Sequence, residues 1–176
     1  ERGLAFSIAS QDPAGGGWRY QPGDPGDMSQ FGWQVMALAS AENAGLVIPE
    51  ATKRRMEKFL LSCCSGDAKG RAGYRPGSRP SVTMTAEALA CRGWLSMNDP
   101  AAIREASSLL ATEFPGEGRT NVYYWYYGTL ALHRVQGEEW SRWNRAMQGS
   151  LIPLQRHGGD LDGSWDPVTV WGSYGG

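Results

Sequence analysis

Apolar residues recur at helical spacing along most of the chain, and no long segment alternates strictly between apolar and polar positions. Phe31, Val35 and Leu38, for example, fall on one stripe of the segment 28–43, which is followed by a glycine. Seven segments carry such a pattern: 2–10, 28–43, 49–63, 83–97, 100–113, 121–135 and 138–155. The pattern predicts an all-α chain.

Capping signals support these boundaries. Asp27 or Ser29 can cap the second helix, because short oxygen-bearing side chains accept hydrogen bonds from free N–H groups of the first turn. Asp99 stands before Pro100, a combination typical of a cap followed by the first helical position. Pro153 should kink the last turn of the final helix.

A template recurs at intervals of roughly 40 to 55 residues. It consists of a basic residue, an apolar or aromatic pair, a glutamine or its substitute, and a glycine-rich corner. The equivalent positions at the corners are Gln11, Cys64, Phe114 and Gln155. Each repeat holds two helices, and stacked hairpins bury faces that one hairpin leaves exposed. The sequence predicts one repeat domain over residues 1–176.

The helix predicted at 121–135 is aromatic on every side, because five consecutive aromatic residues run from Tyr123 to Tyr127. Such a helix must be covered on nearly all faces, as an inner helix of a two-layer ring is. The alternative is that these rings line a ligand cavity. The candidate ligand-binding residues are Tyr123, Tyr124, Tyr126 and Tyr127.

Two corners resemble the QW repeat of squalene-hopene and oxidosqualene cyclases: Gln11 with Gly17-Trp18, and Gln155 with Gly163-Ser164-Trp165. The segment 118–128 is similar to the stretch of protein prenyltransferase β subunits that leads into their zinc site. Both families share an (α/α)₆ toroid. The resemblance implies a partial toroid of about three and a half hairpins with QW-type corners. It also implies that Gln11, Trp18, Gln155 and Trp165 are structural, because in those families the glutamine bonds free backbone groups and stacks on the tryptophan.

The catalytic signatures of these families are missing. Class II cyclases protonate an alkene with an Asp-x-Asp-Asp motif, and the nearest match, Asp160-Leu161-Asp162-Gly163, lacks the final aspartate. Asp160 and Asp162 are catalytic candidates through this partial match alone, and a solvated turn is the alternative. Asp166 lies nearby, but no defensible pair of carboxylates for a carbohydrate-active toroid emerges.

The positions that match the prenyltransferase zinc ligands fall at 120–123, where no residue is a zinc ligand. The two histidines, His133 and His157, are isolated. We therefore expect no metal and no cofactor.

Composition narrows the class of partner. Seventeen basic and eighteen acidic residues give a net charge of −1, which provides no footprint for nucleic acid. The longest uncharged apolar stretch, 122–132, is far shorter than the roughly 20 residues of a membrane span. No targeting segment is visible, so we expect a soluble chain whose compartment is unassigned. Three cysteines, Cys63, Cys64 and Cys91, are expected to be buried thiols.

The sequence thus predicts a cyclase-like or prenyltransferase-like repeat domain without recognisable catalytic motifs. Its expected partner is an apolar, isoprenoid-like or lipid-like ligand, or another protein. The alternatives are an isoprenoid-processing enzyme whose catalytic residues lie outside this segment, and a carbohydrate-active toroid. An incomplete ring exposes an apolar flank, so self-association is expected.

Overall fold

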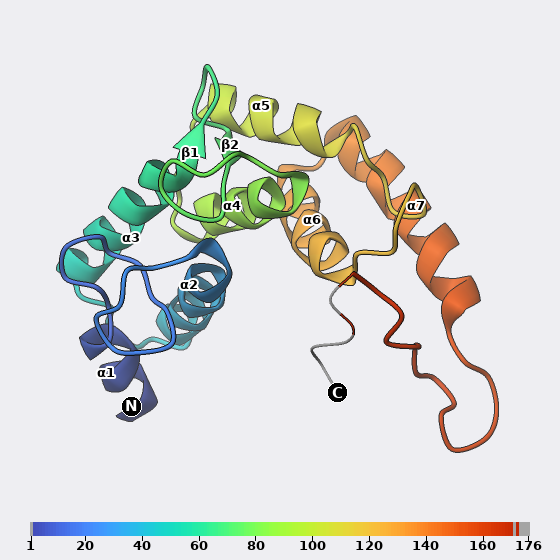
Figure 1. Ribbon diagram of the computed structural model, residues 1–176, viewed down its shortest axis with the longest axis horizontal. Helices are drawn as coiled ribbons and strands as arrows, with labels where there is room; N and C mark the ends of the chain where they lie inside the picture. The colour runs from blue at the N-terminus through green and yellow to red at the C-terminus, as the bar shows by residue number, and fades with distance from the viewer. Residues whose placement is uncertain (1, 171, 173–176) are drawn as a thin grey trace.

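A computed structural model describes residues 2–170 and 172, and in this part of the chain it is mostly helical (Figure 1). Its elements are α1 (Arg2–Ala9), α2 (Met28–Asn43), α3 (Glu50–Cys63), β1 (Cys64–Ser65), β2 (Arg71–Ala72), α4 (Val82–Trp94), α5 (Pro100–Leu110), α6 (Val122–Val135) and α7 (Gly137–Leu154). The predicted all-α class is confirmed, and each predicted helix has a counterpart within a few residues.

Side-chain caps set where the helices begin. Asp27 caps α2, as one of the two predicted alternatives, and its Oδ1 accepts a hydrogen bond from the N–H of Gln30 at 3.0 Å. Ser81 and Asn121 cap α4 and α6 through the same contact to the third residue of the helix. Helices α2, α4 and α6 therefore begin with the same type of cap. Positions in these helices can be compared by counting residues from the cap.

The small hairpin β1–β2 is the element that sequence patterning missed. Its strands have two residues each and pair antiparallel, with Cys64 opposite Ala72. Strands this short cannot show apolar alternation. A contact with α4 stabilises the hairpin, because the N–H of Ala72 donates to Thr85 Oγ1 of that helix at 3.0 Å. The correction is local and leaves the all-α class unchanged.

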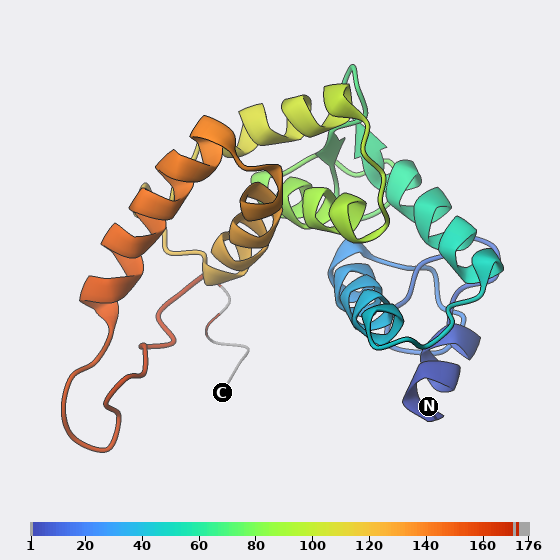
Figure 2. The same cartoon turned by 180° about the vertical axis from the view of Figure 1, so that it is seen from behind.

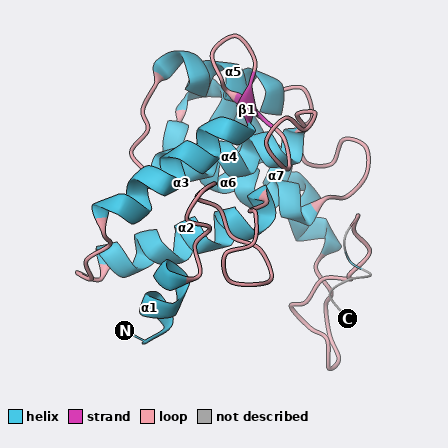
Figure 3. Ribbon diagram, turned by 60° about the vertical axis from the view of Figure 1, so that its left-hand side comes forward, coloured by secondary structure: helices cyan, strands magenta, loops and turns pink. Residues whose placement is uncertain are grey.

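The helices form an arch of two layers. Helices α2, α4 and α6 line its inner side, and α3, α5 and α7 lie outside them (Figures 1 and 2). The turned view shows the helices crossing the molecule with loops at their ends and the hairpin beside α5 (Figure 3). Helix α4 stands at the centre of the inner layer, in contact with α2, α6 and α5.

The buried side chains form two apolar clusters that meet at α4. One is built chiefly by α2 and α3 and the other by α5, α6 and α7. Helix α4 gives Ala88 and Cys91 to the first cluster and Leu89 and Ala90 to the second. The arch therefore has a core that continues through its central helix.

The first corner is closed by Gln11 and Trp18, both buried. The Gln11 side chain donates from Nε2 to the carbonyl of Gly16 at 2.9 Å, and Trp18 donates from Nε1 to the carbonyl of Ser7 at 2.8 Å. Gly16 has φ +88, a conformation that favours glycine. These bonds satisfy backbone carbonyls that would otherwise be left free at the helix end.

The corner after α7 repeats this bonding. Gln155 Nε2 donates to the carbonyl of Gly163 at 2.8 Å, and Trp165 Nε1 donates to the carbonyl of Leu151 at 2.9 Å. In both corners the glutamine reaches the glycine two residues before the tryptophan, and the tryptophan reaches the residue four before the glutamine. The loop of this corner is longer, and both Gly158 and Gly163 in it have positive φ values.

The two corners differ in how far they are tied to the next repeat. Gln11 also donates to the carbonyl of Thr52 at 3.3 Å, and its Oε1 accepts from Arg55 Nε at 2.7 Å. It thereby joins the first corner to α3. Gln155 has no such partner among the described residues, and Trp165 is exposed.

Gln11→Ala should therefore cost roughly 2 kcal/mol of unfolding free energy, because it leaves buried donors and acceptors without partners. Gln155→Ala is the matched control and should change stability by less than about 0.5 kcal/mol, since its site is solvated. Urea denaturation of both variants provides the measurement. Equal losses would contradict the assignment of the first corner as the buried joint between repeats.

Candidate functional site

Helix α4 lies between α2 and α6, two helices that carry aromatic side chains. Every residue of α4 from Met84 to Gly93 is buried, and many of these residues are alanines or other small residues. On its outer side, α5 and β2 provide the cover. Trp33 of α2 and Tyr126 of α6, its neighbours in the inner layer, contact one another.

The two rings form a bridge between α2 and α6, the helices on either side of α4. Their centroids lie 5.8 Å apart with an interplanar angle of 26°, a stacked arrangement. The Tyr126 hydroxyl adds a second link by donating to Met36 Sδ of α2 at 3.3 Å. Trp33 and Tyr126 nevertheless remain 42% and 40% exposed. We call this pair the aromatic bridge; it leaves parts of two large rings open to solvent.

A buried carboxyl group lies on α4 between the same two neighbours. Glu87 is fully buried, and the Tyr123 hydroxyl of α6 donates to it with 3.1 Å to each carboxyl oxygen. Helix α2 makes room for it with a glycine, because a Cβ at Gly32 would lie 2.8 Å from Glu87 Cδ. Tyr127 Oη is buried beside it without a hydrogen bond of standard geometry, although it is close enough to help stabilise the ionised carboxylate.

This environment keeps Glu87 protonated at neutral pH. Burial raises its pKa to about 8, and the negative charge of Asp27 adds to the rise. The hydroxyl groups of Tyr123 and Tyr127 oppose the shift but do not cancel it. Burial, together with Glu87, also raises the pKa of both phenols. The inner centre of the arch is therefore polar but carries no charge at pH 7.

The three residues that meet at this centre hold equivalent places in the repeat. Trp33, Glu87 and Tyr127 are each the sixth residue after the N-cap of their helix. Trp33 and Tyr127 lie 5.8 Å apart between ring centroids, and Tyr127 lies beside Glu87. Neither Trp33 nor Glu87 is a candidate from sequence motifs alone. The signal that could have found Glu87 is a lone acid within the run of small apolar residues from Ala86 to Cys91.

The structure divides the predicted tyrosine run. Tyr126 is exposed on the aromatic bridge, and Tyr123 is half-buried above Glu87. Tyr127 is fully buried. Tyr124 is also buried but points toward α7, where it meets Trp143 edge-on at 5.2 Å. Two of the four candidates, Tyr123 and Tyr126, thus keep part of their side chains exposed, and the other two are buried in the packed core.

The aspartates of the partial cyclase motif lie elsewhere. Asp160 and Asp162 are exposed in the loop after α7, away from the inner helices. Asp162 Oδ1 accepts a hydrogen bond from the N–H of Gly158 at 2.6 Å and so holds a turn, while Asp166 pairs with Arg156. A catalytic role for Asp160 and Asp162 has no support from this geometry.

The cysteines are free and buried, as predicted. Burial raises the pKa of all three thiols, to about 12 for Cys63, so they are protonated and unreactive at neutral pH. Within residues 2–170 and 172 there is no group of three or more acidic, histidine or cysteine side chains placed to hold a metal ion. None of the helices described there is long and apolar enough to cross a bilayer.

Comparison with protein-family models, curated protein sequences and solved structures finds no match. The resemblance to cyclases and prenyltransferases therefore rests on the residues themselves.

Proposed function

We propose that this chain is a helical repeat domain that binds an apolar ligand of isoprenoid-like or lipid-like chemistry on its concave side. The observation that carries the proposal is the aromatic bridge. Two large rings from two helices of the inner layer, stacked on one another, stay about two-fifths exposed. Aromatic faces held in fixed positions are typical contacts for apolar ligands in concave sites.

The protonation of Glu87 supports this choice of ligand. An ionised carboxylate just below the bridge would favour a cation or water over hydrocarbon. Because the pKa of Glu87 is about 8, the group is mostly neutral at pH 7 and its oxygens already bond Tyr123. The surface that the ligand meets is therefore uncharged. The half-buried ring of Tyr123 extends the same surface along α6.

We further propose that the arch is part of an (α/α)₆ toroid of the terpenoid cyclase and protein prenyltransferase type. The alternation of inner and outer helices supports this assignment (Figures 1 and 2). So does the bonding shared by the corners at Gln11 and Gln155. In such a toroid the aromatic bridge would face the central hollow.

Titration with farnesol, an uncharged C15 polyprenol, followed by isothermal calorimetry, tests the ligand proposal. Trp33→Ala and Tyr126→Ala should each weaken binding by about tenfold or more, since a buried aromatic contact contributes on the order of 1.5 kcal/mol or more. Tyr20→Ala removes an exposed tyrosine from the loop between α1 and α2 and should leave the affinity unchanged. Absence of saturable binding, or equal affinities of all three variants, would overturn the proposal.

An enzyme is the second candidate, and Glu87 is the observation that favours it. Among the described residues it is the carboxyl group whose pKa is raised, so it holds a proton at neutral pH that a general acid could transfer to a substrate oxygen. The raised pKa makes it too weak an acid to protonate an alkene directly. Full burial opposes the role of general acid unless the aromatic bridge moves aside. Incubation with farnesol followed by product analysis discriminates the two. An isomerised or cyclised product that disappears in Glu87→Gln would favour the enzyme.

A further inference from the structure

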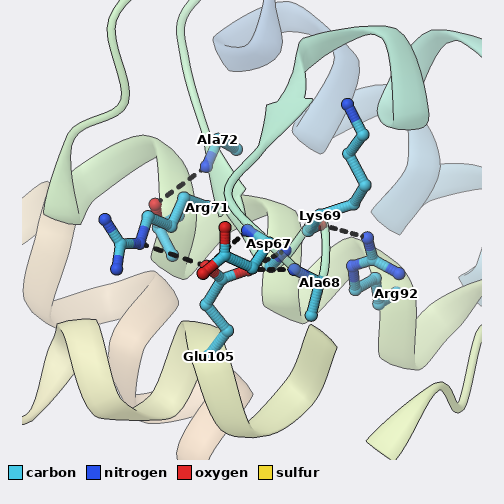
Figure 4. A network of polar contacts seen from close by, with 9 residues as sticks. Asp67, Ala68, Lys69, Arg71, Ala72, Arg92 and Glu105 are labelled. Carbon is cyan, nitrogen blue, oxygen red and sulfur yellow. Dashed lines mark hydrogen bonds and ion pairs between the residues drawn. The ribbon is translucent and has the colours of Figure 1, made fainter. Parts of the chain in front are cut away.

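A second site is indicated by Arg92, which is buried without a carboxylate partner. The residue lies near the end of α4 and is only 3% exposed. Its Nη2 donates to the carbonyl of Lys69 at 2.6 Å and lies 3.7 Å from Cys64 Sγ (Figure 4). Its Nε is buried with no hydrogen-bond partner. Burying a guanidinium group is costly unless a counter-ion is present.

Glu105, an acid in the same network, is already bonded to other groups (Figure 4). Glu105 of α5 accepts hydrogen bonds from the N–H groups of Asp67 and Ala68 at 3.1 Å and of Gly70 at 2.8 Å. It also pairs with Arg71 at 3.4 Å. Desolvation acts to raise the pKa of Glu105, but these donors outweigh it and hold the pKa below its ordinary value. Glu105 therefore serves the hairpin loop and not Arg92.

Arg134, a second arginine, shares a cavity with Arg92. It stands in the last turn of α6, and its side chain crosses Gly93, where a Cβ would lie 2.8 Å from Arg134 Nε. No ion pair joins Arg134 to any carboxylate in the described part of the chain. The cavity has a volume of about 240 Å³. Its remaining walls are mainly apolar: Leu89, Gly93, Met97, Asn98, Ile103 and Val135.

Helix ends do not neutralise this pair of charges. The carboxyl ends of α4 and α6 carry roughly half a negative charge each, and the effect fades within the last turn. Two guanidinium groups around one cavity therefore leave net positive charge beside an apolar wall. An anion with a short hydrocarbon tail satisfies both features. Its head can pair with the two guanidinium groups, and its tail can contact Ile103 and Val135.

We propose that this cavity, formed by α4, α5 and α6, binds a small organic oxyanion, a carboxylate or phosphate monoester with a short alkyl tail. The volume sets the size, since pockets for drug-sized ligands span roughly 300–1,000 Å³ and this one is smaller. The site is separate from the aromatic bridge and does not depend on the function proposed for the concave side.

Calorimetric titration of the whole chain with hexanoate and with butyl phosphate tests the site, and hexanamide serves as the uncharged analogue. We expect saturable binding of at least one anion, and the better binder identifies the head group. Hexanamide should bind at least tenfold more weakly, because it lacks the charge that the arginines recognise.

Two variants assign the binding to the arginines. Arg134→Met, at an exposed position, should give the circular dichroism spectrum of the folded parent. It should lower the affinity for the anion by about tenfold or more. Arg92→Met should abolish binding, and a retained melting transition shows that the variant is folded. Failure of both anions to bind, equal binding of hexanamide, or unchanged affinity in Arg134→Met would each overturn the proposal. Farnesol binding should be unaffected in either variant, which separates this test from the earlier one.

Discussion

Alanine in place of Gly32 should destabilise the fold by roughly 2 kcal/mol, the net of an overpacking cost and a small gain in helix propensity. The new methyl group would lie 2.8 Å from Cδ and 2.9 Å from Cγ of Glu87. Glu87 cannot swing away, because it is fully buried and bonded to Tyr123. The expected result is a lower urea midpoint with an unchanged slope.

Gly149→Ala provides the matched control, since Gly149 lies inside α7 and a Cβ there meets nothing within 4 Å. This control should be stabilised by up to about 1 kcal/mol. In addition, Glu87→Ala removes the side chain that the new methyl group would overlap. The double variant should therefore have a free energy of unfolding about 1 kcal/mol or more above the value that the sum of the two single effects predicts. Strict additivity would show that the two residues are not in contact.

The stability of the parent chain should fall as pH rises from about 5 to 8, and Glu87→Gln should remove much of that fall. Glu87 has an ordinary pKa of 4.5 when unfolded and about 8 when folded. Between these values the unfolded state releases the proton while the folded state keeps it, so raising the pH favours unfolding. The limiting slope is about 1.4 kcal/mol per pH unit, which gives a loss of roughly 2 to 4 kcal/mol across this range.

Urea denaturation at pH 5, 6, 7 and 8 measures this dependence. Glu87→Gln should come close to the parent near pH 5, where both side chains are neutral in the folded state, and exceed its stability at pH 8. Glu105→Gln is the control of opposite sign, because the pKa of Glu105 is lowered. Its contribution is present above the ordinary pKa of 4.5 and is lost as pH falls below that value, so its slope between pH 5 and 8 should match the parent. Parallel profiles of all three chains would refute a neutral Glu87.

Much of the fold could be predicted from sequence because local signals agree with the tertiary structure. The apolar stripe of Phe31, Val35 and Leu38 faces α3 in the core, and Asp27 caps α2 as the sequence allowed. The corners at Gln11 and Gln155 could be matched by residue type, since the bonding needs an amide, a glycine and an indole at related spacings. Residue spacing does not predict that Gln11 accepts a hydrogen bond from Arg55, or that Gln155 has no such partner among the described residues.

The candidate site was harder to predict because it depends on which faces meet. Periodicity marks α6 as a helix that must be covered, but it does not say that Tyr124 meets Trp143 on the outer side while Tyr126 stays exposed. Trp33 and Glu87 become partners only when α2, α4 and α6 lie side by side. Counting from the N-caps would have aligned Trp33, Glu87 and Tyr127, had the three inner helices been superposed first.

Self-association stays a prediction. Apolar side chains remain exposed near both ends of the arch, among them Phe6 of α1 and Ile152 and Leu154 of α7. Sedimentation across a wide concentration range measures it. A single monomeric species throughout would contradict the expectation that the flanks seek further repeats.

The three inner helices bring a protonated acid, Glu87, to a buried place between Gly32 of α2 and Tyr123 of α6. The most direct measurement is a ¹³C NMR titration of the Glu87 carboxyl carbon, assigned by comparison with Glu87→Gln. The account predicts a midpoint near pH 8. A midpoint near the ordinary value of 4.5 would place Glu87 in water and contradict the arrangement of α2, α4 and α6 described above.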